Sequence, residues 1–179
     1  MKHFTSALFL VASFGLFGQN CTQPFISEYL EGSSNNKALE IVNPSSSPLN
    51  MSIYSISSFN NGNTSPTNTF QFPNITLPAN GVYVIANGNA DPSILSVSDT
   101  TSGVTWFNGD DAIVLFKNTD TLDIIGVVGT DPGTSWVVGS GATKEFTLVR
   151  KTTVQTGQTN WAIGAGEWDV SPQNTFTYL

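Results

Sequence analysis

The sequence predicts an all-β protein built as an antiparallel sandwich or barrel. Short apolar runs recur along the chain and alternate with segments rich in Gly, Asn, Ser, Thr and Pro, a pattern typical of antiparallel strands joined by turns. No segment of roughly ten or more residues carries an apolar stripe with helical spacing, so we expect almost no helix. Aromatic residues make up 11% of the chain and charged residues only 11%, a composition typical of exported β proteins.

The first half of the chain contains several apolar runs that end at turn signals. The strands expected there cover residues 25–30, 38–42, 53–59, 69–72 and 82–86. The first two flank a polar loop, residues 31–37, and are expected to pair as a hairpin. Before the last of these strands, Asn80-Gly81 supplies the positive φ that a tight hairpin requires.

The second half of the chain contains the most apolar pair of expected strands. They cover residues 112–116 and 122–128, and both are apolar enough to be central in a sheet. A further strand is expected at residues 146–149. The tail at residues 175–178 is expected to close the sheet or to cover an edge.

Residues 1–18 are predicted to be a secretory signal peptide. Lys2 and His3 precede an apolar run that ends at Phe17 and is followed by small or polar residues. The run is too short and too interrupted to span a membrane, which takes ~20 apolar residues. We therefore expect a secreted or cell-surface protein without a transmembrane segment. Lipid attachment at Cys21 is disfavoured, because the residues before it do not match such a site.

Charge and composition exclude several classes of function. Without Lys2 the mature chain has five Lys and Arg against thirteen Asp and Glu, a net charge of −8, which repels nucleic-acid backbones. The only histidine, His3, lies in the signal peptide, so the mature chain cannot form a Ser-His-Asp or Cys-His triad or an ordinary zinc site. Cys21 is the only cysteine, so the domain is expected to fold without an internal disulfide.

Glu28 and Glu40 form the first candidate site. In the expected hairpin they lie directly opposite each other, which is unfavourable for like charges unless a cation, Lys37, Arg150 or another register relieves it. The simplest interpretation is that one of the two glutamates accepts hydrogen bonds from the loop amides of residues 32–36. The alternative is bound calcium, which prefers oxygen ligands.

Strand alternation adds a constraint on Glu28. It places Ile26, Glu28 and Leu30 on one face of the first strand, and Phe25, Ser27 and Tyr29 on the other. One face must therefore bury or shield a glutamate among apolar neighbours, and a buried carboxylate requires a partner.

Asn108-Gly109-Asp110-Asp111 forms the second polar cluster. Placed before a strong strand, it is predicted first as a turn in which Asp110 caps free amides. Calcium is again the alternative, because an exported acidic domain meets this ion outside the cell, although no EF-hand spacing is present. No other cofactor is expected.

The tryptophans suggest a second class of function. Flat aromatic platforms on a β-sandwich can stack on sugars, although buried aromatic residues are commoner. The candidates for this role are Trp106, Trp136, Trp161 and Trp168. A carbohydrate-binding or adhesive module is therefore weighed beside a third class, a hydrolase that uses only carboxylates at separations of ~5–9.5 Å. The four acidic residues named above would have to supply these carboxylates.

Five motifs, in their order along the chain, resemble a lamin-tail domain of the bacterial secreted type. They are F-I-S-E-Y-L-E-G-S-S-N-N-K-A-L-E-I-V-N, F-Q-F-P-N-I-T-L-P-A-N-G-V-Y-V-I-A-N, W-F-N-G-D-D-A-I-V-L-F-K-N, D-I-I-G-V-V-G-T-D-P-G-T-S-W and T-L-V-R-K. The resemblance covers nearly all of the mature chain and implies one immunoglobulin-like β-sandwich over residues 24–179. Such domains in bacteria are often attached to extracellular nucleases or phosphoesterases and are regarded as binding or tethering modules. The family has no established active site, so no catalytic residue is carried over.

Together these observations predict an exported, non-enzymatic binding or tethering module. Its expected partner is an extracellular or cell-surface protein or glycan. The resemblance also suggests that it serves as the targeting module of an extracellular nuclease or phosphoesterase. The sequence leaves the ligand and the oligomeric state open.

Overall fold

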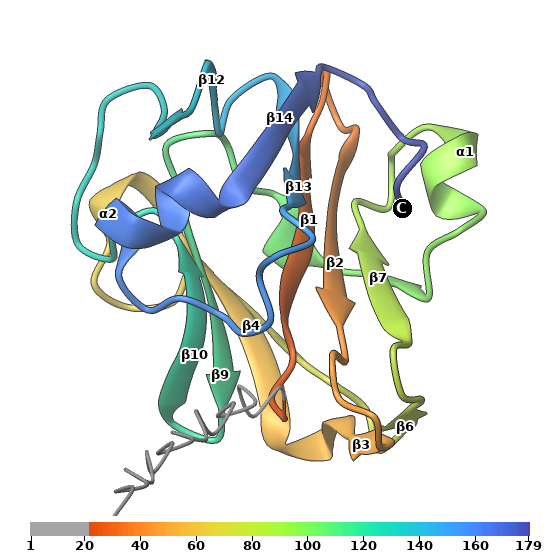
Figure 1. Cartoon of the computed structure of the whole chain (residues 1–179). Coiled ribbons are helices and arrows are strands. Elements are labelled where there is room, and N and C mark those ends of the chain that lie inside the picture. Colours follow the sequence, from red (N-terminus) through yellow and green to blue (C-terminus); the bar gives the residue numbers. More distant parts are fainter. Residues whose placement is uncertain (1–21) are drawn as a thin grey trace, which may run out of the picture.

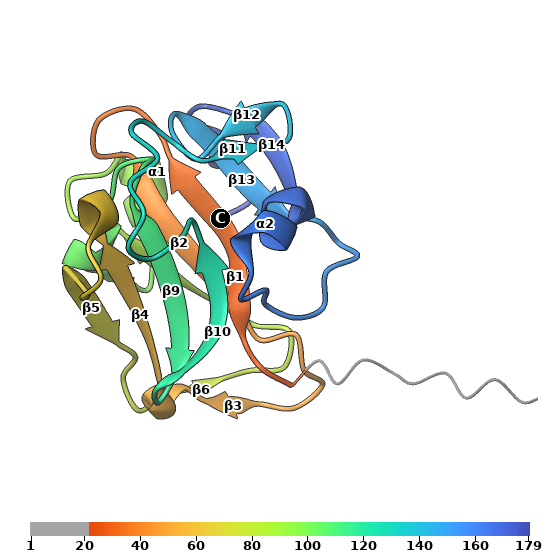
Figure 2. The same cartoon turned by 90° about the vertical axis from the view of Figure 1, so that its left-hand side faces the viewer.

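Two β-sheets packed face to face form the body of the protein (Figure 1, Figure 2). The computed structural model describes residues 22–179, so the expected signal peptide lies outside the described residues. The larger sheet has the strand order β14 (Trp168–Pro172), β13 (Phe146–Arg150), β1 (Phe25–Glu31), β2 (Lys37–Val42), β7 (Val82–Ala86) and β8 (Thr100–Thr101). The smaller sheet has the order β10 (Asp120–Ile125), β9 (Ala112–Lys117), β4 (Tyr54–Phe59) and β5 (Asn68–Gln71).

Neighbouring strands in both sheets run antiparallel, except that β8 runs parallel to β7. This arrangement confirms the prediction of an all-β, immunoglobulin-like antiparallel β-sandwich. Two short ribbons complete the strands, β3 (Leu49–Asn50) with β6 (Thr76–Leu77), and β11 (Val137–Val138) with β12 (Gly141–Ala142).

The described helices are short, as the lack of a helical stripe predicts. The α-helices are α1 (Pro92–Leu95) and α2 (Trp161–Gly164), and the single 3-10 turns are η1 (Met51–Ile53), η2 (Asn60–Gly62), η3 (Gly103–Thr105) and η4 (Ala165–Glu167). Within residues 22–179, no helix has the length and hydropathy needed to cross a membrane.

Each strand expected between residues 25 and 149 has an observed counterpart, whereas β3, β6, β8, β11, β12 and β14 were not predicted. The strand expected at residues 122–128 stops at Ile125, because Gly126 has a φ of 77° and leaves the extended conformation. It is also an edge strand rather than a central one. Residues around α2 cover its free edge, where the amide of Ile124 donates to the carbonyl of Gln158 at 3.1 Å.

The C-terminal tail forms no strand at residues 175–178, and the last strand is β14, which lies earlier. Phe176 and Leu179 instead pack against an outer face of the six-stranded sheet, together with α1. Figure 1 shows the C-terminus beside α1. The tail therefore covers a face rather than an edge.

The Asn80-Gly81 turn has the expected local geometry but a different role. Asn80 has a φ of 57°, and the amide of Gly81 donates to the carbonyl of Pro78 at 3.0 Å. The strands on either side, β6 and β7, pair with β3 and β2 and not with each other. The turn therefore transfers the chain between sheets, and the expected tight hairpin is wrong here.

The main core lies between the two sheets and draws residues from both. Its fully buried members include Ile26, Tyr29, Leu39, Ile41, Ile56, Ile85, Ile113 and Leu115. A second cluster joins Leu30, Ala38 and Ala86 to Ile94 of α1 on the outer face of the six-stranded sheet. Both faces of β1 and β2 are therefore covered along part of their length.

A β-bulge between Ile26 and Glu28 shifts the alternation of β1 against β2. Ile26 and Tyr29 both belong to the main core, whereas Leu30 belongs to the outer cluster. The expectation that Ile26 shares a face with Leu30 is therefore wrong, because the bulge adds one residue to the strand. The same bulge leaves Glu28 and Leu30 together on the outer face.

Candidate functional site

Glu28 and Glu40 lie directly opposite each other on β1 and β2, as the hairpin pattern predicts. Glu28 is 1% exposed and Glu40 is 8% exposed. Glu40 accepts a hydrogen bond of 2.6 Å from Oγ of Ser27. Neither carboxylate oxygen of Glu28 has a hydrogen-bond partner in the described part of the chain.

The two carboxyl groups both have raised pKa values. Burial, reinforced by the charge of Glu40, raises the pKa of Glu28 from 4.5 to about 8. Burial also raises the pKa of Glu40, while the hydrogen bond from Ser27 opposes this shift. Glu28 is therefore protonated at neutral pH, and protonation removes the repulsion between the facing side chains.

The loop between these strands is fixed without help from Glu28 or Glu40. The amide of Gly32 donates to the carbonyl of Asn36 at 2.7 Å, and the amide of Ser33 donates to Oδ1 of Asn174 at 2.9 Å. The prediction that one of the two glutamates accepts hydrogen bonds from loop amides is therefore wrong. Asn174, which sequence reasoning missed, takes part of that role from the far end of the chain.

Lys37 does not neutralise Glu28 or Glu40, because it is paired elsewhere. It forms a buried ion pair with Glu31, whose other carboxylate oxygen accepts from the amide of Glu145. The ammonium of Lys37 also lies 5.9 Å from the ring centroid of Phe107. Glu31 was missed in the sequence, although its position opposite Lys37 in the hairpin is a signal for this pair.

Arg150 is also engaged away from Glu28 and Glu40. It forms a buried ion pair with Asp123 of the opposite sheet and a second pair, at 2.8 Å, with Glu167. Its guanidinium stacks 4.1 Å from the ring centroid of Trp168. Asp123 also accepts from the amide of Ile26 at 2.9 Å. These contacts join the two sheets and were not predicted, although a lone carboxylate inside an apolar strand is a recognisable signal.

In the second acidic cluster, Asp111 does what was expected of Asp110. Asp111 is fully buried and accepts from the amides of Asn108 at 2.7 Å and Asn61 at 2.8 Å. Burial raises its pKa, and these two hydrogen bonds oppose the shift. Asp110 has one buried oxygen with no hydrogen-bond partner among the described residues. The cluster is a turn, as predicted, but the capping residue is the neighbouring aspartate.

The four candidate calcium ligands thus fall into two places, Glu28 with Glu40 and Asp110 with Asp111. Among residues 22–179, no three His, Cys, Asp or Glu side chains are grouped so that they could hold a metal ion. Calcium requires 6–8 oxygen ligands, so backbone carbonyls and water would have to supply most of them. Calcium binding stays a prediction.

Three of the four tryptophans contribute to packing. Trp161 and Trp168 are buried in the main core. Trp136 is half-buried and packs against that core, close to Gly126. None of the three is largely exposed.

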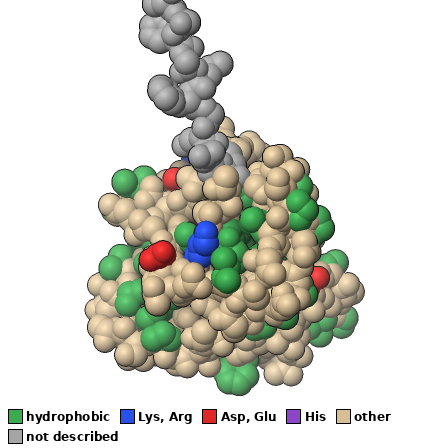
Figure 3. All heavy atoms as spheres, turned by 90° about the horizontal axis from the view of Figure 1, so that it is seen from below, with side chains coloured by type: hydrophobic (Ala, Val, Ile, Leu, Met, Phe, Trp, Pro, Cys, Tyr) green, Lys and Arg blue, Asp and Glu red, His purple; other side chains and the backbone are tan. Residues whose placement is uncertain are grey.

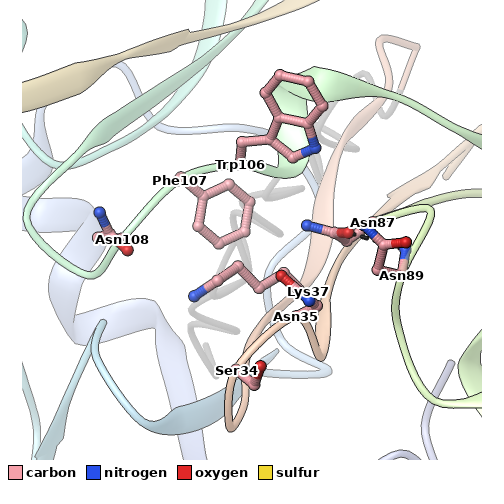
Figure 4. A pocket seen from close by; sticks show the side chains of 8 residues that line it. All are labelled: Ser34, Asn35, Lys37, Asn87, Asn89, Trp106, Phe107 and Asn108. Atoms are coloured by element: carbon pink, nitrogen blue, oxygen red, sulfur yellow. Dashed lines mark hydrogen bonds between the residues drawn. The ribbon is translucent and has the colours of Figure 1, made fainter.

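Trp106 differs, because it is 63% exposed. It follows η3, and its amide donates to the carbonyl of Gly103, which closes that turn. Trp106 lies between two hollows, of about 340 Å³ and about 290 Å³, that also share Asn89. The first hollow is lined by Ser34, Asn35, Lys37, Asn87, Asn89, Trp106, Phe107 and Asn108 (Figure 4). The second is lined by Gly88, Asn89, Thr101, Ser102, Gly103 and Trp106.

Three loops from one end of the sandwich line the first hollow, and residues of β8 and η3 complete the second. The three loops are the β1–β2 loop, the segment after β7, and the segment between η3 and β9. The amide of Asn87 donates to the carbonyl of Lys37 at 2.9 Å, and the amide of Asp91 donates to Oδ1 of Asn36 at 2.8 Å. These bonds fix the first two loops to each other. Figure 3 views the opposite end of the molecule, where charged and apolar side chains are scattered.

The polar lining of the hollows is largely free to bind a ligand. The side-chain amides of Asn35, Asn89 and Asn108 are exposed and make no hydrogen bond to other described residues. Sequence reasoning missed these asparagines, although Asn87-Gly88-Asn89 directly follows an apolar strand. Such a surface offers hydrogen-bond donors and acceptors beside one aromatic platform, which suits binding.

Comparison with known families agrees with the resemblance found in the sequence. The profile described as Lamin Tail Domain matches residues 19–130. The comparison with curated protein sequences gave no significant match.

Proposed function

Because this chain belongs to the lamin tail domain family, we propose that it is an exported binding module that attaches to an extracellular or cell-surface partner through the loops around Trp106. The family assignment supports a non-catalytic immunoglobulin-like module. The apolar leader-like segment at residues 1–18 supports export. The targeting of an extracellular nuclease or phosphoesterase is a proposal that rests on the family resemblance.

The exposure of Trp106 is the observation that carries the binding site. A large ring that is 63% exposed does not gain the hydrophobic stabilisation that burial gives to other tryptophans of this chain. Tryptophan is also the residue type most enriched among energetically dominant binding residues. Trp106 stands between two hollows whose walls carry exposed side-chain amides without a partner among the described residues, so these amides are open to a polar ligand.

The positions of the carboxylates support binding over hydrolysis. Glu28 and Glu40 face each other within a sheet and line neither hollow. Asp111 is fully buried and engaged with two backbone amides. A carboxylate-only hydrolase requires a paired acid and base at a substrate cleft. Asp110 lines a further hollow of about 220 Å³ that shares Asn108 with the first, but its neighbour Asp111 is buried and already engaged, so no accessible pair is formed there.

Sedimentation with cell-envelope fragments of the producing organism tests the proposal. We expect the mature chain to sediment with the fragments and Trp106→Ala to weaken this association about 30-fold, the usual effect of losing a dominant binding tryptophan. Tyr178→Ala is the matched control, because it removes an aromatic side chain that is 56% exposed and lines neither hollow.

Two results would contradict the proposal. If the wild-type chain fails to sediment with the fragments, the attachment function is wrong. If the fragments are hydrolysed by the wild-type chain and not by Glu28→Gln or Glu40→Gln, the protein is an enzyme.

A further inference from the structure

The ligand class follows from the chemistry around Trp106, and this step rests on the proposed function. We infer that the Trp106 surface binds a neutral glycan, with a sugar ring stacked on the indole and sugar hydroxyls bonded in the two flanking hollows. Neither the family assignment nor the fold specifies this ligand.

The indole of Trp106 packs on one side against the protein. A Cβ atom added to Gly103 would lie 3.5 Å and 3.6 Å from two atoms of the indole ring, so the ring packs beside the backbone of η3. Figure 4 shows the ring at the rim of the first hollow, above Phe107. A rigid aromatic ring provides a large contact area at little cost in conformational entropy. One face of a sugar ring carries mostly C–H groups and is complementary to it.

The groups beside the indole match the hydroxyl groups of a sugar. Each side-chain amide presents two donors and one acceptor oxygen, and a hydroxyl can both donate and accept. Asn89 belongs to both hollows, while Asn35 and Asn108 line the first and Ser102 lines the second. An apolar ligand would leave these groups without partners, which is unfavourable.

The charge of the surface favours a neutral ligand over an acidic one. Lys37 is the only charged side chain among the described residues that line the two hollows. It is buried and already paired with Glu31. The mature chain, with a net charge of −8, repels anions at long range. Within these two hollows no free cation is therefore offered to a phosphate, a sulfate or a uronic acid. The exposed Lys144 lines a neighbouring hollow, where Asp110 lies beside it.

The arrangement of the hollows indicates more than one sugar unit. The two hollows meet at Trp106 and Asn89, and each is about as large as the smallest typical ligand pocket, roughly 300 Å³. A ring stacked on Trp106 would therefore have neighbours that reach into one or both hollows. We expect oligosaccharides to bind more tightly than the corresponding monosaccharide.

Protease treatment of the envelope fragments separates a glycan from a protein ligand. We expect association to survive exhaustive proteolysis of the fragments, because the ligand is a carbohydrate. Loss of Trp106-dependent association after proteolysis would overturn the glycan inference while leaving the attachment function intact. Failure of the untreated fragments to bind would instead contradict the attachment function.

Competition with defined oligosaccharides tests the charge and size of the ligand. The probes are neutral oligosaccharides of glucose, mannose, galactose or N-acetylglucosamine, and oligosaccharides of a uronic acid. At least one neutral oligosaccharide is expected to compete, whereas the uronic acid series is not. The inference would be overturned if none of the neutral oligosaccharides competed, or if only the uronic acid oligosaccharides competed.

Variants locate the site on the protein. Binding of the competing oligosaccharide, followed by calorimetry, is expected to fall about 30-fold in Trp106→Ala and less in Trp106→Phe, which keeps an aromatic face. Asn89→Ala is expected to weaken it about 3-fold to 10-fold, the loss of one or two hydrogen bonds. Tyr178→Ala should bind as the wild type does. Unchanged binding in Trp106→Ala, with thermal melts showing that the variant is folded, would place the glycan elsewhere.

Discussion

Glu28 and Glu40 face each other across the β1–β2 hairpin, and both carboxylate oxygens of Glu28 lack a hydrogen-bond partner among the described residues. Lys37 and Arg150, the cations that could have stood between them, are paired with Glu31 and Asp123. Protonation of Glu28 is therefore what keeps the two side chains compatible in the absence of a bound cation.

The stability of the protein is expected to decline as the pH rises from about 5 to about 8. Folded Glu28 keeps its proton up to a pKa of about 8, whereas the unfolded residue loses it near 4.5. The folded state therefore binds more protons in this window, and the free energy of unfolding falls with increasing pH. Each unit of pKa difference corresponds to about 1.4 kcal/mol, so the decline should reach a few kcal/mol. Urea unfolding at several pH values measures it.

Glu28→Gln isolates this effect, because glutamine stays neutral and its amide can donate to Glu40. The variant should lose most of the decline between pH 5 and pH 8 that the wild type shows. Glu145→Gln makes the same chemical change at an exposed glutamate and should behave like the wild type. Identical pH profiles for the wild type and Glu28→Gln would contradict the assignment.

Calcium is expected to raise the melting temperature relative to a chelator, as the acidic composition predicts. At Glu28 the ion would replace the proton, so the calcium effect should grow as the pH approaches 8. Glu28→Gln should abolish a shift that arises at this pair, and Asp110→Asn should abolish one that arises at the second pair. Thermal melts of the wild type, Glu28→Gln and Asp110→Asn measure this shift in melting temperature. Equal melting temperatures of the wild type with calcium and with chelator would refute calcium binding.

The ion pair between Asp123 and Arg150 is expected to stabilise the sandwich strongly. Asp123→Ala leaves the Arg150 guanidinium buried without this partner and removes the acceptor of the Ile26 amide. The free energy of unfolding should fall by about 3–5 kcal/mol. Asp120→Ala, an exposed position on the same strand, should change it by less than about 0.5 kcal/mol. Urea unfolding of both variants tests this, and equal effects would show that the pair is not stabilising.

The hairpin shows how much of the site could be predicted from local pattern. The register that places Glu28 opposite Glu40 follows from two adjacent strands and the length of their loop. The bulge after Ile26 could not be predicted from alternation, because one extra residue in a strand leaves no distinct mark in the sequence. The pairing of Arg150 with Asp123 joins opposite sheets, so it depended on how the sheets pack.

The tryptophans show where local pattern stops being informative. The same residue type has different exposure at different positions: Trp106 is largely exposed, whereas Trp161 and Trp168 are buried. Trp161 begins a short helix and Trp106 follows a 3-10 turn, and strand alternation does not apply to either. Their burial was decided by the segments that pack over them.

The sequence by itself determined the all-β class, most strands, the family and the opposition of Glu28 and Glu40. These features depend on short-range periodicity and on the order of motifs, which the chain carries regardless of its packing. Tertiary structure decided which cations were already paired, which tryptophan stayed open, and which loops met beside it. Those outcomes depend on contacts between residues far apart in the chain, and burial or exposure exists only once such contacts have formed.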